Sequence, residues 1–125
     1  MDSSWPTSWQ GSTNIECGED GSFPVVVTTE SQPTGAHART FELIRSRWPE
    51  IWSEFRRVIT ELMVSYGRET PEWSGVSTLY IGVPDEPIVD DADWSVGVVF
   101  SGSETLWSLP YRGWSACPQQ AQAIY

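Results

Sequence analysis

The sequence contains no lysine and a single histidine, and each scarcity excludes a class of chemistry. All seven basic residues among the 125 are arginine. Without lysine the chain has no amine for Schiff-base chemistry and no phosphate-binding lysine of the P-loop type. Any Ser-His-Asp or Cys-His mechanism would have to use His37, and a zinc site with two histidines is excluded. We interpret His37 as a structural residue near the start of a helix rather than as a general base.

Cysteine is scarce as well, and long apolar runs are absent. Cys17 and Cys117 fit neither a C-x-x-C redox pair nor a zinc-binding spacing, so we expect two reduced thiols rather than a disulfide. No run approaches the roughly 18 apolar residues of a membrane span. The first residues lack the basic and apolar regions of a secretory signal. The sequence therefore predicts a cytoplasmic protein, and we expect neither a cofactor nor a metal site.

Acidic residues, in contrast, are abundant. Seventeen Asp and Glu against seven Arg give a formal net charge of −10. Such a surface repels nucleic-acid phosphates and anionic lipids, so we expect neither nucleic acid nor a membrane as a partner. Residues 1–38 carry five acids (−5), residues 39–68 six Arg against four Glu (+2), and residues 69–125 eight acids against one Arg (−7). If the outer blocks form the sheet, the sheet side is acidic and the helix side is near neutral.

The central block has the periodicity of helices. Apolar residues recur every three or four positions, with polar residues on the opposite face. Pro49 disfavours helical geometry at the residue before it, which divides the block in two. We predict helices over about residues 36–47 and 49–66, the second with proline in its first turn and ended by Gly67.

The flanking blocks have the patterns of strands. Residues 14–17 and 23–29 enclose a cluster of turn-forming residues and predict a hairpin. Residues 76–83 are rich in β-formers, and residues 94–100 alternate between large apolar and small side chains. A short turn then leads into a last strand over residues 105–109. The last three strands are predicted to pair antiparallel in sequence order.

The length and these elements predict one domain over residues 1–125. Residues 1–10 are expected to form a loose N-terminal arm, and residues 115–125 an irregular C-terminal tail. The predicted class is α+β. Its two layers are a mostly antiparallel sheet of about five strands and a helix pair packed on one face of that sheet.

The most unusual local feature is an acid-rich connection between two predicted strands. Its carboxylates are Asp85, Glu86, Asp90, Asp91 and Asp93. Oxygen-rich loops bind Ca²⁺, and two close carboxylates can perform acid-base or glycosidase chemistry. The segment lacks the D-x-D-x-D-G pattern with a distal Glu that a calcium loop requires. A solvated loop that keeps the strand edges soluble is the alternative interpretation.

The eight tryptophans are the second unusual feature. Four fall on apolar stripes and are expected in the core: Trp48, Trp52, Trp94 and Trp107. The other four lie among Ser, Pro and Gly, where they either cover the ends of the sheet or anchor a binding surface: Trp5, Trp9, Trp73 and Trp114. The candidate binding residues are therefore Trp73, Asp85, Glu86, Asp90, Asp91, Asp93, Tyr111 and Trp114.

The order of these features resembles a known kind of domain. Four parts of the sequence carry this resemblance: Trp9-Gln-Gly11 before the hairpin, Tyr66-Gly67 after the helical region, the strand Trp94 to Phe100, and Gly113-Trp114. Over residues 9–114 this layout resembles small bacterial α+β domains, some of which occur in polymorphic-toxin immunity loci. The resemblance implies an acidic cytoplasmic protein that binds a cognate toxin, and it supplies no catalytic residue.

We therefore predict a non-enzymatic, acidic protein-binding domain whose partner is a basic protein, with neutralisation of a basic effector as one role. Opposite charge would speed the encounter, and aromatic residues would anchor the complex. The nucleotide-binding glycine motifs and the H-E-x-x-H and G-x-S-x-G motifs are absent from the sequence.

Two alternatives remain open. One is a small carboxylate-based hydrolase or ligand-binding protein that uses the loop from Asp85 to Asp93, with Tyr111 and Arg112 holding an anionic or sugar group. It predicts a concave pocket in which the carboxylates converge with Trp73 or Trp114. The other is a structural homodimer formed through a sheet edge or the helix pair, so that the chain is either a monomer or a homodimer.

Overall fold

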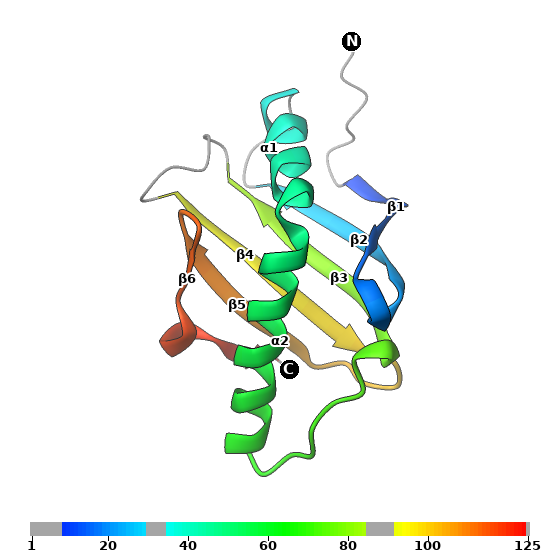
Figure 1. Ribbon diagram of the computed structural model, residues 1–125, viewed down its shortest axis with the longest axis vertical. Helices are drawn as coiled ribbons and strands as arrows, with labels where there is room; N and C mark the ends of the chain where they lie inside the picture. Colours follow the sequence, from blue (N-terminus) through cyan, green and yellow to red (C-terminus); the bar gives the residue numbers. More distant parts are fainter. Residues whose placement is uncertain (1–8, 30–34, 85–91, 125) are drawn as a thin grey trace.

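Two helices and a seven-stranded sheet make up the described parts of the chain (Figure 1). The computed structural model describes residues 9–29, 35–84 and 92–124, with side chains from residue 14 onward. The elements are, in order, β1 (Trp9–Glu16), β2 (Ser22–Thr29), α1 (Gly35–Ser46), α2 (Trp48–Ser65), β3 (Val76–Val83), β4 (Asp93–Phe100), β5 (Leu106–Arg112), β6 (Ser115–Ala116) and β7 (Gln122–Ile124). The predicted α+β class is confirmed.

The sheet is mixed, and it is larger than predicted. Its order is β1-β2-β3-β4-β5-β6, with β7 also paired to β5. The expected hairpin and the antiparallel β3-β4-β5 succession are confirmed, but β2 and β3 are parallel. Both helices connect β2 to β3, and this provides the long crossover connection that two parallel neighbouring strands require. Residues 115–124, expected to be irregular, add the two short strands β6 and β7.

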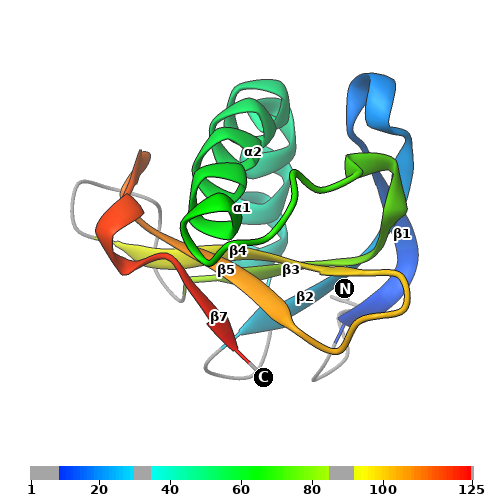
Figure 2. The same cartoon turned by 90° about the horizontal axis from the view of Figure 1, so that it is seen from below.

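Both helices lie on one face of the curled sheet, as Figure 2 shows. Each begins and ends within one residue of its predicted bounds. Gly67 has a φ of +78° and follows α2 in a Schellman arrangement, in which the N–H of Arg68 donates to the carbonyl of Met63. No helix among the described residues is long and apolar enough to cross a membrane.

The two faces of the sheet differ in chemistry. Apolar residues at alternate positions of β2 to β5 point toward the helices and form the core with Phe41, Ile44, Phe55 and Ile59. The opposite, outer face of these four strands carries two side chains that are charged at neutral pH, Asp93 and Arg112, which pair with each other at 3.5 Å. Apart from Asp93, the acids of the outer sequence blocks do not lie on this face of the four strands, and the acidic sheet side stays a prediction for the connections.

Candidate functional site

A groove runs along the outer side of α2, between that helix and the turn that joins β1 to β2. This turn contains the short 3₁₀ helix η1 (Gly18–Asp20). The groove has a volume of about 660 Å³. Its lining residues come from both sides: Glu16, Cys17, Gly18 and Glu19 from the turn, and Trp48, Pro49, Trp52, Ser53, Arg56, Arg57, Thr60 and Glu61 from the helix.

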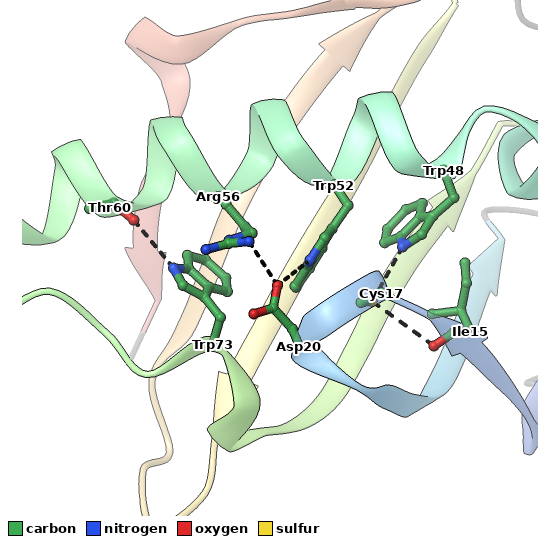
Figure 3. Close-up of polar contacts among 8 residues, drawn as sticks. All are labelled: Ile15, Cys17, Asp20, Trp48, Trp52, Arg56, Thr60 and Trp73. Carbon is green, nitrogen blue, oxygen red and sulfur yellow. Dashed lines mark hydrogen bonds and ion pairs between the residues drawn. The ribbon is translucent and has the colours of Figure 1, made fainter.

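One row of side chains on α2 forms the wall of this groove. The row consists of Trp48, Trp52, Arg56 and Thr60, which are spaced by four residues and therefore stack along one face of the helix. Each of the four makes a polar contact with a segment outside the helix, and Figure 3 shows these contacts in sequence along the helix. The row thus fixes the distance between α2 and the segments that face it.

The centre of the row is a shared carboxylate. Oδ2 of Asp20 accepts a hydrogen bond from Nε1 of Trp52 at 2.9 Å and forms an ion pair with Arg56 at 3.0 Å (Figure 3). The Asp20 side chain is 14% exposed, so water screens the ion pair less than it would at the surface. A single acidic residue of the turn therefore holds two neighbouring positions of the helix.

Cys17 occupies the end of the row nearest the start of α2. Its Sγ accepts a hydrogen bond from Nε1 of Trp48 at 3.3 Å and donates a weak one to the carbonyl of Ile15. Burial raises the pKa of the Cys17 thiol to about 11. At neutral pH the thiol is protonated, so Cys17 acts as a packing residue and hydrogen-bond acceptor rather than as a nucleophile.

Trp73 closes the row at its other end. It lies in the 3₁₀ helix η2 (Trp73–Gly75), and its Nε1 donates to Oγ1 of Thr60 at 3.3 Å. Its ring packs edge-on against Trp52 at 5.3 Å, and Arg56 lies over it at 5.8 Å. We call Trp48, Trp52 and Trp73 the hairpin-side cluster. All three are at least 94% buried, and each indole N–H has a side-chain acceptor.

The rim of the groove carries charges of both signs. Arg57 pairs with Glu61 at 3.4 Å, one of the helical pairs that the sequence pattern allows, and the two charges cancel. Glu16 and Glu19 are exposed at the turn and form no ion pair within the described residues. The uncompensated charge of the rim is therefore negative and lies at the turn.

The predicted acid-rich site falls largely outside the described residues. Four of its five carboxylates lie outside the described residues: Asp85, Glu86, Asp90 and Asp91. The structure describes only the fifth, Asp93. Asp93 begins β4 and is exposed, and it pairs with Arg112. A smaller hollow of about 360 Å³ beside it is lined by Thr28, Thr29, Gly82, Val83, Trp94 and Ser95.

The structure separates the described candidate residues into three places. Trp73 precedes β3, whereas Asp93 begins β4, which runs antiparallel to β3. The two residues therefore lie at opposite ends of this strand pair. Tyr111 is buried on the helix-facing side of β5, and Trp114 lies half-buried in the turn after it. Tyr111 and Trp114 share one cluster, and neither lines the hollow beside Asp93.

That second cluster lies on the side of α2 away from the groove. It consists of Trp94, Tyr111 and Trp114, and we call it the β5-side cluster. Trp94 stacks on Tyr111 at 4.5 Å and meets Trp114 edge-on at 5.9 Å, and Arg47 lies 4.2 Å above the Trp114 ring. Nε1 of Trp94 donates to the carbonyl of Gly113 at 2.6 Å. The Tyr111 hydroxyl is buried and has no hydrogen-bond partner among the described residues.

The remaining candidate groups have structural positions. His37 is in the first turn of α1, as predicted, and is buried. Cys17 and Cys117 are free thiols on segments near opposite edges of the sheet, as expected. Within the described ranges, no group of three or more His, Cys, Asp or Glu side chains is arranged to hold a metal ion.

Sequence reasoning did not identify the groove. Trp48 and Trp52 were correctly expected to be buried, but their polar partners lie 31 and 32 residues away along the chain. The sequence contained one signal for the groove: Trp48, Trp52 and Arg56 are spaced by four residues and therefore share one helix face. In the structure this face lies opposite the acidic turn. Comparisons of the chain with protein-family models, curated proteins and solved structures found no match.

Proposed function

We propose that this chain is a non-enzymatic, acidic protein-binding domain, and that the groove along α2 receives a basic segment of a partner protein. The observation that carries the proposal is the pair of carboxylates without ion pairs, Glu16 and Glu19, in a groove that also presents the exposed apolar ring of Pro49. A lysine or arginine side chain suits this combination. Its charged head meets the carboxylates, while its aliphatic stem covers the ring of Pro49.

The chemistry of the groove supports binding rather than catalysis. Its cysteine is a protonated, hydrogen-bonded thiol, and its lining contains no histidine. Its basic side chains, Arg56 and Arg57, are engaged by Asp20 and Glu61. The role that we propose is neutralisation of a basic effector in the cytoplasm, which fits this chemistry and agrees with the resemblance to immunity-locus domains that the sequence suggests.

The proposal is tested with two synthetic peptides of equal length, one alternating Arg with Leu and the other alternating Glu with Leu. Isothermal titration calorimetry should detect binding of the basic peptide alone. Raising NaCl from about 50 to about 500 mM should weaken that binding, because salt screens attraction between exposed charges. Equal binding of both peptides, or of neither, would contradict the proposal.

A matched pair of double variants assigns the binding to the groove. Glu16→Gln with Glu19→Gln removes two charges from the rim, and Glu69→Gln with Glu104→Gln removes two exposed charges that do not line the groove. The first variant should lose about five- to thirtyfold in affinity, at about 0.5–1 kcal/mol per charge, and the second less than about twofold. Equal losses would show that only net charge matters.

A further inference from the structure

An arginine lines the groove to which we assign a basic segment, although its charge opposes such a partner. Arg56 is one of the lining residues, and its side chain is 44% exposed. A guanidinium is always charged in proteins, so Arg56 contributes a positive charge to the wall. Alone, this charge would repel a lysine or arginine of the partner and would offset part of the attraction from Glu16 and Glu19. A groove for a basic segment therefore requires a group that neutralises Arg56.

Asp20 supplies the neutralising charge from behind the groove. Its Oδ2 lies 3.0 Å from Nη1 of Arg56, and its side chain is 14% exposed. Asp20 is not one of the lining residues, but the turn directs its carboxylate toward Trp52 and Arg56 (Figure 3). The hydrogen bond from Nε1 of Trp52 to the same oxygen, at 2.9 Å, fixes the carboxylate in this place. The negative charge is therefore held next to Arg56 and is largely shielded from water.

The two arginines of the groove differ in how they are held. Arg57 pairs with Glu61 at 3.4 Å, and both side chains are more than half exposed, so water and salt screen this pair strongly. Glu61 lines the groove beside Arg57 and adds its own negative charge to the same surface. Arg56, in contrast, also lies over the ring of Trp73 at 5.8 Å, which keeps its guanidinium at the groove. The net charge at this fixed position therefore depends on Asp20.

We infer that Asp20 is a specificity-determining residue of the groove, because its charge neutralises Arg56 and thereby allows a basic segment to bind. This role rests on the proposed function. It adds a second determinant to the rim carboxylates, one that lies behind the wall and acts through the charge of Arg56 rather than by touching the partner. Substitutions at the two members of the ion pair should therefore change the affinity for a basic segment in opposite directions.

Single and double substitutions at this ion pair are measured with the peptide of alternating Arg and Leu, by isothermal titration calorimetry at about 50 mM NaCl. Asp20→Asn leaves the charge of Arg56 uncompensated and should weaken binding about two- to fivefold. Arg56→Gln removes the positive charge, leaves the Asp20 carboxylate in place and should strengthen binding about two- to fivefold. The double variant carries neither charge and should bind within about twofold of the wild type.

The opposite signs distinguish a role of charge from a role in holding the turn. If Asp20 only held the turn against α2, both single substitutions would break the same contact and both would weaken binding. Raising NaCl to about 500 mM should also reduce the differences among the variants, because salt screens charge and does not restore a displaced turn. Circular dichroism verifies that each variant is folded. Arg56→Gln changes a half-exposed side chain and carries the test even if Asp20→Asn is unstable.

A second arginine ion pair provides the matched control. Arg45 pairs with Glu42 at 3.1 Å on α1, and its side chain is 42% exposed, but neither residue lines the groove. Arg45→Gln makes the same change in net charge and should alter the affinity by less than about 1.5-fold.

Three results would overturn this role of Asp20 while leaving the proposed function in place, provided that the wild type binds the basic peptide. They are unchanged or weaker binding by Arg56→Gln, unchanged or stronger binding by folded Asp20→Asn, and a gain from Arg45→Gln equal to that from Arg56→Gln. A wild type that binds neither the basic nor the acidic peptide would contradict the proposed function, and the role of Asp20 with it.

Discussion

The hairpin-side cluster and the β5-side cluster lie on the two sides of α2, and they satisfy their polar atoms in different ways. In the hairpin-side cluster every indole N–H donates to a side chain of another segment. In the β5-side cluster Trp94 donates to a backbone carbonyl, and the Tyr111 hydroxyl has no described partner. Directional bonds fix relative positions, whereas packing alone tolerates small shifts. The hairpin-side cluster is therefore the better support for a binding groove.

Removing the central ring of the hairpin-side cluster should have the largest effect. Trp52 packs against Trp48, Phe55 and Trp73 and is 5% exposed. Trp52→Ala should lower the free energy of unfolding by about 3–5 kcal/mol, through lost packing and a cavity. Trp114→Ala in the half-exposed part of the β5-side cluster should cost about 1–2 kcal/mol. Urea denaturation measures both, and equal losses would contradict the contrast between the clusters.

The shared carboxylate gives the next largest effect. Asp20→Ala removes the ion pair with Arg56 and leaves the buried N–H of Trp52 without an acceptor, which should cost about 1–3 kcal/mol. The control is Asp93→Ala, which breaks the Asp93–Arg112 pair, whose side chains are 75% and 65% exposed. That loss should stay below about 0.5 kcal/mol. If the two variants were equally stable in urea, the Asp20 contacts would not hold the turn to α2.

Alkaline pH should act on the hairpin-side cluster through Cys17. Its pKa of about 11 in the folded chain lies above the value of about 9 expected after unfolding. The folded state therefore holds the proton more tightly, and this contribution is complete below about pH 9 and is lost as pH rises through about 11. We expect a loss of about 1–2 kcal/mol.

Comparison with Cys17→Ala isolates that effect. Urea denaturation at about pH 8 and about pH 10.5 should show a smaller alkaline loss in the variant than in the wild type, because the variant has no thiol to ionise. Tyr111, whose pKa is also raised by burial, is present in both proteins, so its contribution cancels in the difference. An identical loss in both proteins would assign the alkaline sensitivity to other groups.

Local patterns predicted the elements well, and pairings distant in sequence escaped them. The helix bounds followed from a 3.6-residue period and from Pro49 and Gly67, which act on their immediate neighbours. The parallel pairing of β2 with β3 depends on how the helices cross the sheet, and no residue within either strand encodes it. β6 and β7 contain two and three residues, too few to show alternation.

The candidate site was harder to predict for the same reason. Because Pro and Ser surround Trp73 in the sequence, the pattern left two alternatives, a cover over the end of the sheet or an anchor of a binding surface; in the structure a short 3₁₀ turn directs it into the core against Trp52. The sequence does not distinguish Asp20 from the other acids of its turn, because only the fold brings Asp20 beside α2. Neighbouring sequence reports local conformation, but the burial of a side chain depends on which distant segment covers it.

The smallest predicted effect is on the Tyr111 hydroxyl, and it distinguishes the β5-side cluster most clearly from the hairpin-side cluster. Removing a buried tyrosine hydroxyl usually destabilises a protein by about 1 kcal/mol, because a hydrogen bond is lost. The Tyr111 hydroxyl has no described partner, and its burial already costs desolvation energy. Tyr111→Phe should therefore leave the free energy of unfolding unchanged or raise it by up to about 1 kcal/mol. A measured loss of about 1 kcal/mol or more in urea would show that the hydroxyl is satisfied, and the contrast between the two clusters would then fail.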